Sequence, residues 1–170
     1  LFCGAGGAGE GYRRAGFEVV GVDIKPQPHN PHVFIQADAI DYLNEYGHEF
    51  DVIHASPPCQ RYSSSTRANG TQDNHPDLIP IIQSKLKALG KPYIIENVMG
   101  APLENALKLN GMMFNLDTIR NRLFETNPAI YFVPNEKRKH KTACRQGMKP
   151  IRDEQYIHVV GNFSDVEYGR

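Results

Sequence analysis

A chain of 170 residues is long enough for one well-buried domain and too short for two full ones. Its 19 basic and 19 acidic residues cancel overall, although residues 135–152 carry seven Lys or Arg and a single Glu. Three widely spaced cysteines exclude a disulfide framework, and no apolar run approaches membrane-spanning length. We therefore expect a cytoplasmic protein without a membrane segment.

Short apolar runs alternate with glycine-rich or polar segments in the first half of the chain. Residues 1–3 resemble the end of a strand, and a glycine-rich loop and a short helix through residues 12–15 follow. Apolar runs at 19–22 and 33–35 predict two more buried strands, and residues 39–46 predict a helix. The pattern is typical of a strand-loop-helix-strand unit.

The second half continues this alternation. Strands are expected at 51–55 and 93–98, with a helix at 77–89 between them. Alternating strands and helices predict an α/β fold, with a mostly parallel sheet, helices on both faces and ligands at the carboxyl ends of the strands. Beyond Phe124 the pattern weakens, and residues 127–160 resemble a small, basic, irregular insertion.

The glycine loop at residues 4–9 has the G-x-G-x-x-G spacing of a dinucleotide-binding turn. Asp23 ends the next strand, where an acid would bind ribose hydroxyls. Asp38 would accept a hydrogen bond from an adenine amino group, or cap the helix that begins at Ala39. NAD and S-adenosylmethionine both satisfy this chemistry, and a glycine turn without a ligand is the alternative. These residues indicate a nucleoside cofactor without identifying it.

A cysteine stands on a rigid turn directly after an apolar strand, in Pro57-Pro58-Cys59-Gln60. The two prolines restrict the backbone before the thiol and help to fix the direction of the sulfur. A thiolate is a usable nucleophile. These neighbours favour a reactive cysteine over a buried structural one.

A carboxyl group and two arginines complete the candidate chemistry. Glu96 follows an apolar strand whose surroundings favour a neutral carboxyl that hydrogen-bonds a base edge, the alternative being an ordinary ion pair. Asn97 beside it is expected to satisfy backbone groups. Arg120 and Arg122 alternate like strand residues on one face and would contact a base carbonyl or phosphates, or form a plain surface pair. Thiol and carboxyl together predict covalent chemistry.

The basic segment at residues 135–152 favours a nucleic acid over a merely solvated loop. His140 and Cys144 have a spacing that metal ligands use, but no second pair accompanies them. We therefore expect no metal site.

Together these motifs resemble those of the DNA cytosine carbon-5 methyltransferases. The order and approximate spacing agree from residue 1 to about 126. The compact form, with its characteristic residues 22–28 and 54–60, is most similar to the small enzymes of bacteriophages. The matching motifs are the cofactor-binding opening Leu1-Phe2-Cys3-Gly4-Ala5-Gly6-Gly7, the nucleophile motif Pro58-Cys59-Gln60, the cytosine-binding motif Glu96-Asn97-Val98 and the arginine motif Arg120-x-Arg122.

This resemblance implies a Rossmann-like fold, S-adenosylmethionine as the cofactor and double-stranded DNA as the partner of a monomer in a bacterial or phage-infected cell. Cys59 would attack carbon 6 of a flipped cytosine, Glu96 would bind ring nitrogen 3 and the exocyclic amine, and Arg122 would hold the carbonyl at carbon 2, with Arg120 alongside. The residues implied for the cofactor are Phe2, Gly4, Gly6, Gly7, Asp23, Ile24, Asp38, Ala39 and Pro58. Those implied for the nucleic acid are Gln60, Ser63, Asn97, Lys137, Arg138, Lys139, Lys141 and Arg145.

The resemblance also implies a division of the chain. Residues 1–126 would form the catalytic and cofactor-binding domain, with the first strand and the closing motif truncated. Residues 127–160 would form a short target-recognition region, and residues 161–170 would begin the return to the catalytic domain.

Three other functions fit parts of the sequence. Residues 56–60 also resemble the transfer-RNA members of the same family. An inactive cofactor-binding or DNA-binding relative would not need both Cys59 and Glu96. An NAD oxidoreductase would use the glycine loop and leave the cysteine and glutamate motifs unexplained.

Overall fold

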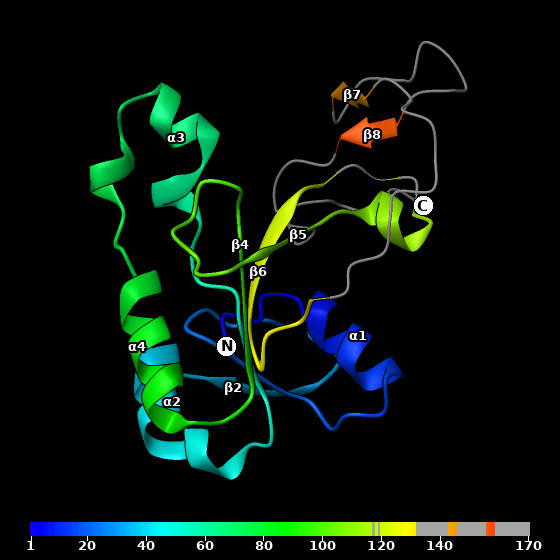
Figure 1. Cartoon of the computed structure of the whole chain (residues 1–170). Helices are drawn as coiled ribbons and strands as arrows, with labels where there is room; N and C mark the ends of the chain where they lie inside the picture. Colours follow the sequence, from blue (N-terminus) through cyan, green and yellow to red (C-terminus); the bar gives the residue numbers. More distant parts are fainter. Residues whose placement is uncertain (117, 119, 132–142, 146–155, 159–170) are drawn as a thin grey trace.

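The computed structural model describes residues 1–116, 118, 120–131, 143–145 and 156–158, and Figure 1 shows their arrangement. Within these residues, the α-helices are α1 (Gly7–Arg14), α2 (Ala39–Tyr46), α3 (Ser64–Ala68) and α4 (Ile79–Leu89). Short 3-10 helices are η1 (Gly47–Glu49), η2 (Gln60–Tyr62), η3 (Gln72–Asn74) and η4 (Gly111–Phe114). The strands are β1 (Val20–Asp23), β2 (Val33–Gln36), β3 (Ile53–Ala55), β4 (Tyr93–Asn97), β5 (Leu107–Leu109), β6 (Arg122–Asn127), β7 (Ala143–Arg145) and β8 (Tyr156–His158).

The strands form a mixed α/β architecture, which confirms the α/β part of the expected fold. β1 and β2 pair in parallel, and β3 pairs in parallel with β4. The sheet then continues in the order β3-β4-β6-β5, with β6 antiparallel to both β4 and β5. Strand β5 and this antiparallel part of the sheet were not predicted, because β5 has only three residues, none of them buried, and β6 mixes polar and apolar residues without a continuous apolar run.

Residues 1–3 lie between β1 and β3 and connect the two sheets. The Leu1 amino group donates to the His54 carbonyl at 2.6 Å, Ser56 N donates to Leu1 O at 3.2 Å, and Cys3 N donates to Val22 O at 3.1 Å. The expected strand is not regular there, because Phe2 has a φ of 57°, in the left-handed region. This irregular segment leads directly into the glycine loop.

The core lies where α2 and α4 pack against β3 and β4, while α1 lies on the other side of the sheet (Figure 1). Burial alternates along β4, as it does in a strand with one face on the core. The buried core residues are Leu43, Ile53, Ala55, Ile82, Leu86, Tyr93 and Ile95. Because alternate residues face opposite ways, His54 and Glu96 point away from this core.

The predicted helices agree with the structure apart from their ends. α2 spans the expected residues, and α4 begins two residues later than predicted and ends at Gly90, which has a φ of 70°. α3 was not anticipated; it begins after Ser63, whose hydroxyl accepts from Thr66 N at 3.2 Å. Within the described ranges, no helix has the length and apolarity needed to cross a bilayer.

Candidate functional site

Cys59 lies on the loop between β3 and η2, at the carboxyl end of a buried parallel strand. Its thiol is free and partly exposed. The preceding Pro57 is buried, and its carbonyl accepts a hydrogen bond from the Asn97 side chain at 2.8 Å. Asn97, only 3% exposed, also accepts from Val98 N at 2.9 Å. As expected, Asn97 satisfies backbone groups, and it ties the cysteine loop to the end of β4.

Glu96 and Arg122 form an ion pair across the antiparallel strands β4 and β6. Arg122 Nε lies 2.8 Å from Glu96 Oε1, and the two side chains are 23% and 24% exposed. The register explains the contact, since Asn97 lies opposite Leu123 and the two charged residues are therefore diagonal neighbours. The predicted apolar surroundings of this carboxyl are not found; a guanidinium from a strand that is remote in sequence lies beside it, which is the ion-pair alternative.

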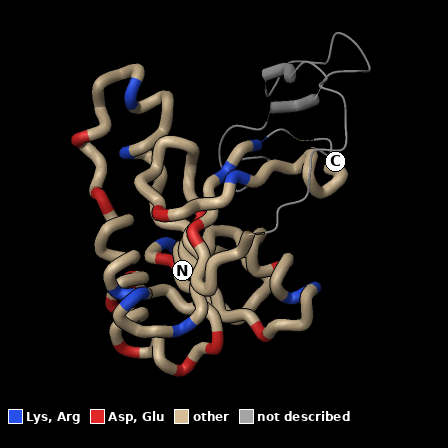
Figure 2. Tube along the Cα trace, viewed as in Figure 1, with Lys and Arg blue, Asp and Glu red and all other residues tan. Residues whose placement is uncertain are grey.

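Arg120 shares this electrostatic environment. Burial, and then the neighbouring charge of Arg122, lowers the pKa of the Arg120 guanidinium, while Glu96 and Cys59 act in the opposite direction. Arg120 therefore lies within electrostatic range of Arg122, Glu96 and Cys59. Figure 2 shows basic positions at β5 and the adjoining end of β6, close to this site.

The glycine loop is held over β1 by Asp23. One carboxylate oxygen accepts from Gly4 N at 3.0 Å, and the other accepts from Lys25 N at 3.1 Å. Gly4 and Gly6 have φ values of 49° and 85°, which favour glycine. A Cβ at Gly4 would meet no atom within 4 Å, and the same holds at Gly7. The backbone at Gly4 and Gly7 is therefore open to a ligand.

Gly6 has a different role. A Cβ there would lie 2.8 Å from Asn30 Oδ1, because the proline-rich segment after β1 folds back over the loop. Asn30 Nδ2 donates to Gly4 O at 3.1 Å, and His32 Nε2 lies 3.3 Å from Gly6 O. Part of the dinucleotide fingerprint thus serves packing within the protein.

The remaining residues expected at the cofactor differ in exposure. Ile24 is 64% exposed beside Asp23, and Pro58 is exposed next to the cysteine. Asp38 caps α2, since its Oδ1 accepts from Ile40 N at 2.8 Å and from Asp41 N at 3.1 Å, which is the alternative weighed for it. Ala39 is 3% exposed, so its side chain belongs to the core.

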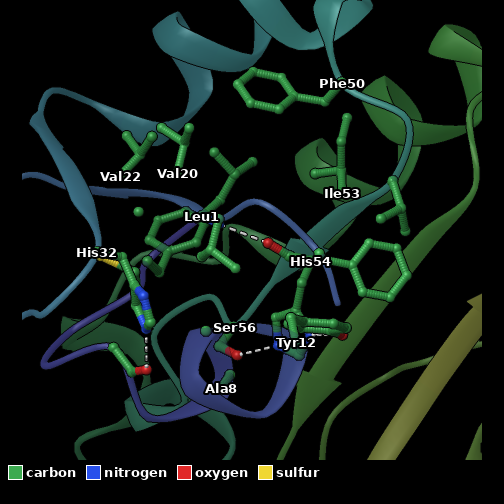
Figure 3. A pocket seen from close by; sticks show the side chains of 18 of the residues that line it. Leu1, Ala8, Tyr12, Val20, Val22, His32, Phe50, Ile53, His54 and Ser56 are labelled. Atoms are coloured by element: carbon green, nitrogen blue, oxygen red, sulfur yellow. Dashed lines mark hydrogen bonds between the residues drawn. The ribbon is translucent and has the colours of Figure 1, made fainter. Parts of the chain in front are cut away.

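A cavity of about 140 Å³ lies between α1, β1 and β3 (Figure 3). Phe2 and Gly6 line it, but Asp23, Asp38 and Cys59 do not. Burial lowers the pKa of the Leu1 amino group at its edge to about 6. The cavity is mainly apolar and separate from the cysteine, so we do not assign the reaction to it.

Three hydrogen-bonded side chains beside this cavity escaped the sequence analysis. Tyr12 Oη lies 2.7 Å from His54 Nδ1, and His54 Nε2 lies 2.9 Å from Ser56 Oγ. The sequence feature that could have predicted these contacts is His54, the one polar residue of an otherwise apolar strand. Its position in the strand places its side chain on the face opposite the core.

The residues predicted to contact nucleic acid are only partly described. Gln60 is exposed, whereas Ser63 caps α3. The segment with Arg145 forms β7, whose backbone pairs in parallel with β8. Outside the described residues lie Lys137, Arg138, Lys139 and Lys141.

Comparison with known proteins links these motifs to one family. The family model described as C-5 cytosine-specific DNA methylase matches residues 1–119. The type II methyltransferase M.AgeI of Thalassovita gelatinovora is 28% identical over 116 residues, which are 59% of this chain and 27% of the relative. The type II methyltransferase M.AplI of Arthrospira platensis is 26% identical over 146 residues, covering 82% of this chain and 42% of the relative.

The chain thus spans less than half the length of these two curated relatives. The matched family region contains the glycine loop, Cys59 and Glu96, and Arg120 and Arg122 lie just beyond it. Because the family model covers well over half of the chain, the protein belongs to the C-5 cytosine-specific DNA methylase family.

Proposed function

We propose that this protein transfers a methyl group to carbon 5 of cytosine in DNA, with Cys59 as the nucleophile. The observation that carries the proposal is that Arg120 interacts electrostatically with Cys59, Glu96 and Arg122, which come from three separate segments, and that Glu96 and Arg122 form an ion pair. Each group has a function in this chemistry: the thiolate adds to the base, and the carboxylate and guanidinium groups hold its polar edge.

The addition step follows from the electronic structure of cytosine. Carbon 5 is a poor nucleophile until the Cys59 thiolate forms a bond to carbon 6, which moves the electron pair of the 5,6 double bond onto carbon 5 and, by conjugation, toward ring nitrogen 3. Hydrogen bonds from the pocket to ring nitrogen 3, the amine and the carbonyl would stabilise this charge as it develops. Once carbon 5 has accepted the methyl group, loss of its proton restores the 5,6 double bond and expels the thiolate.

Glu96 and Arg122 would bind the base as a unit. Their 2.8 Å contact fixes the direction of the carboxylate before the base arrives, so little reorganisation is required when it binds. Arg122 also donates to Asn121 O at 2.9 Å, which restricts the guanidinium further. The target atom is inaccessible within a stacked duplex, so the cytosine must be flipped out.

The residues around the glycine loop fit S-adenosylmethionine. The backbone at Gly4 and Gly7 is open, Asp23 lies at the loop as an acceptor for ribose hydroxyls, and the exposed Ile24 offers an apolar surface to an adenine ring. When bound, this cofactor supplies the methyl group that carbon 5 accepts. Membership of the DNA methylase family also disfavours the alternative that this protein is an NAD oxidoreductase.

Double-stranded DNA is the proposed substrate, since the family model is described as a DNA methylase and both relatives are named type II methyltransferases. We extend the proposal to a Rossmann-like catalytic domain at residues 1–126, a short basic target-recognition region at 127–160 and a return segment from 161. We also propose that the protein is a phage-type enzyme that acts as a monomer in the bacterial cytoplasm.

Covalent trapping tests the function directly. Full-length protein is incubated with S-adenosylmethionine and DNA that contains 5-fluorocytosine, whose fluorine cannot leave as the proton does, so that the cysteine stays bonded to the base. We expect an adduct with Cys59 in the wild-type protein and none with Cys59→Ser. A transfer-RNA arm with the same analogue separates the two substrate classes.

Bisulfite sequencing of DNA from cells that express the protein gives the second measurement. Protected cytosines at a defined sequence are expected, and their loss in Cys59→Ser ties them to this chain. The absence of both adduct and protected cytosines with DNA would refute the proposed function.

A further inference from the structure

A hydrogen-bonded chain of three side chains joins α1 to the cysteine loop. Tyr12 comes from α1, His54 from β3, and Ser56 from the first position after β3 (Figure 3). The two contacts measure 2.7 and 2.9 Å, and the Tyr12 and His54 rings also meet edge to face, with centroids 5.5 Å apart and an interplanar angle of 69°. Both ring nitrogens of the histidine are therefore engaged.

The imidazole ring of His54 is neutral and therefore donates one of its two hydrogen bonds and accepts the other. Burial, and then the nearby Leu1 amino group, lowers the pKa of His54 to about 4, so that one ring nitrogen carries a hydrogen and the other accepts one at neutral pH. Burial also raises the pKa of the Tyr12 hydroxyl, which stays protonated. Each tautomer of His54 satisfies both neighbours, since each hydroxyl can donate or accept.

The position of Ser56 determines what this chain can control. Its backbone N–H donates to Leu1 O at 3.2 Å, and only two prolines separate it from Cys59. Because proline fixes φ and restricts the residue before it, a displacement of Ser56 is transmitted to the thiol rather than absorbed. On the other side, Asn97 holds the Pro57 carbonyl.

The other end of the chain lies on the helix that follows the glycine loop. α1 begins at Gly7, and Tyr12 lies in its second turn. The same three side chains therefore connect the backbone proposed to hold the methyl donor with the loop that carries the nucleophile.

We propose that Tyr12, His54 and Ser56 are positioning residues, which hold Cys59 at a set position relative to the glycine loop. This inference rests on the proposed function, in which Cys59 attacks the base. An error of about 1 Å in the position of a reacting group costs on the order of 100-fold in rate. These three side chains thus affect the rate at which Cys59 adds to the base and leave the binding of DNA and cofactor largely unchanged.

Two substitutions at His54 separate its two contacts. The amide of His54→Asn reaches the position of Nδ1 and that of His54→Gln the position of Nε2, so each keeps one contact at most. We expect roughly 10- to 100-fold slower formation of the 5-fluorocytosine adduct in both, with a KM for DNA and a Kd for S-adenosylmethionine within about twofold of wild type. Tyr12→Phe keeps the serine contact and should slow the reaction roughly 3- to 10-fold.

The matched control is Tyr46→Phe, which removes the hydroxyl of a tyrosine that packs on Tyr42 in α2, away from the cysteine. Thermal unfolding of each variant shows whether it is folded. If the His54 variants do not fold, Tyr12→Phe and Ser56→Ala carry the test. Adduct rates within twofold of wild type in the folded variants would overturn the proposal.

A second readout is independent of methyl transfer. Alkylation of Cys59 by iodoacetamide, followed by mass spectrometry of its peptide, is expected to become several-fold faster in His54→Gln and Tyr12→Phe, because the loop loses an anchor. An unchanged rate contradicts the positioning role. If wild-type protein forms no adduct although this alkylation responds as expected, the proposed function fails and the positioning role stands.

Discussion

Glu125 is a buried carboxylate whose replacement gives the sharpest test of the packing beneath the site. It is 3% exposed on β6 and accepts three hydrogen bonds. Its Oε2 accepts from Gln83 Nε2 at 2.7 Å and from Glu104 N at 2.8 Å, and its Oε1 accepts from the Tyr93 hydroxyl at 3.0 Å. These contacts join α4, β4 and the loop before β5 to the strand that carries Arg122.

The cost of Glu125→Leu follows from the donors left behind. A buried donor without an acceptor costs about 1–3 kcal/mol. Gln83 keeps a second acceptor, Pro102 O at 3.3 Å, so the loss falls mainly on the Glu104 N–H and the Tyr93 hydroxyl. We expect a decrease of about 3–5 kcal/mol in the free energy of unfolding, or roughly 10 °C in Tm for a chain of this size.

Glu125→Gln should cost much less. Its amide oxygen can replace Oε2 and accept from both nitrogens, while its NH2 donates to the Tyr93 oxygen, which accepts as readily as it donates. The variant loses only the extra strength that a charged acceptor gives to these hydrogen bonds. This loss should lower the free energy of unfolding by about 1–2 kcal/mol. Burial, and then Glu125, raises the pKa of Tyr93 to about 12, so spectrophotometric titration should show a lower value in this variant.

Urea and thermal unfolding of both variants measure these differences. The matched control is Glu104→Gln, whose side chain is 61% exposed and pairs with Lys87, and which should change the free energy of unfolding by less than about 1 kcal/mol. A loss below about 1 kcal/mol for Glu125→Leu, or equal losses for the Leu and Gln variants, would refute the reasoning.

Three further perturbations test other parts of the protein. Gly9→Ala places a methyl group 2.7 Å from an imidazole ring and should lower the free energy of unfolding by about 1–3 kcal/mol. The methyl group of Gly11→Ala meets no atom within 4 Å, so this variant should raise the free energy of unfolding by up to about 1 kcal/mol. Equal effects of the two substitutions in urea titrations would contradict the packing. Arg122→Lys keeps the charge but loses the fork that faces Glu96, so methyl transfer to DNA should fall roughly 10- to 100-fold with little change in Tm, and full activity would argue against the pair. Because burial lowers the pKa of His54 from 6.5 to about 4, the unfolded chain binds a proton in this range that the folded chain does not, and stability should fall as the pH drops from about 6.5 toward 4. His54→Gln should flatten this decline in urea titrations between pH 4 and 7, and an unchanged slope would speak against the buried neutral ring.

The regular elements were largely predictable because they depend on local patterns. The apolar runs before Asp23 and within residues 93–98 became strands, and the residue after Asp38 began a helix as the capping alternative anticipated. The antiparallel pair formed by β5 and β6 was not predicted, since β5 is a three-residue edge strand and neither strand carries a distinctive periodicity.

The candidate site was predicted by residue type but not by contact. The positions of Cys59 and Glu96 after apolar strands indicated chemistry at a common edge of the sheet. The direct partner of Glu96 could not be predicted, because Arg122 reaches it only through an antiparallel register between strands more than twenty residues apart. The burial of Asn97 against the Pro57 carbonyl likewise depends on how two loops approach each other.

By itself, the amino-acid sequence determined the α/β class and the family and pointed to the candidate reactive groups, because each depends on short segments whose order and spacing are visible in one dimension. The tertiary structure alone decided which groups touch: the ion pair across β4 and β6, the donors around Glu125 and the Tyr12–His54–Ser56 chain. The physical reason is that hydrogen bonds and ion pairs require separations of about 3 Å, and only the packing of remote strands and helices brings these side chains that close.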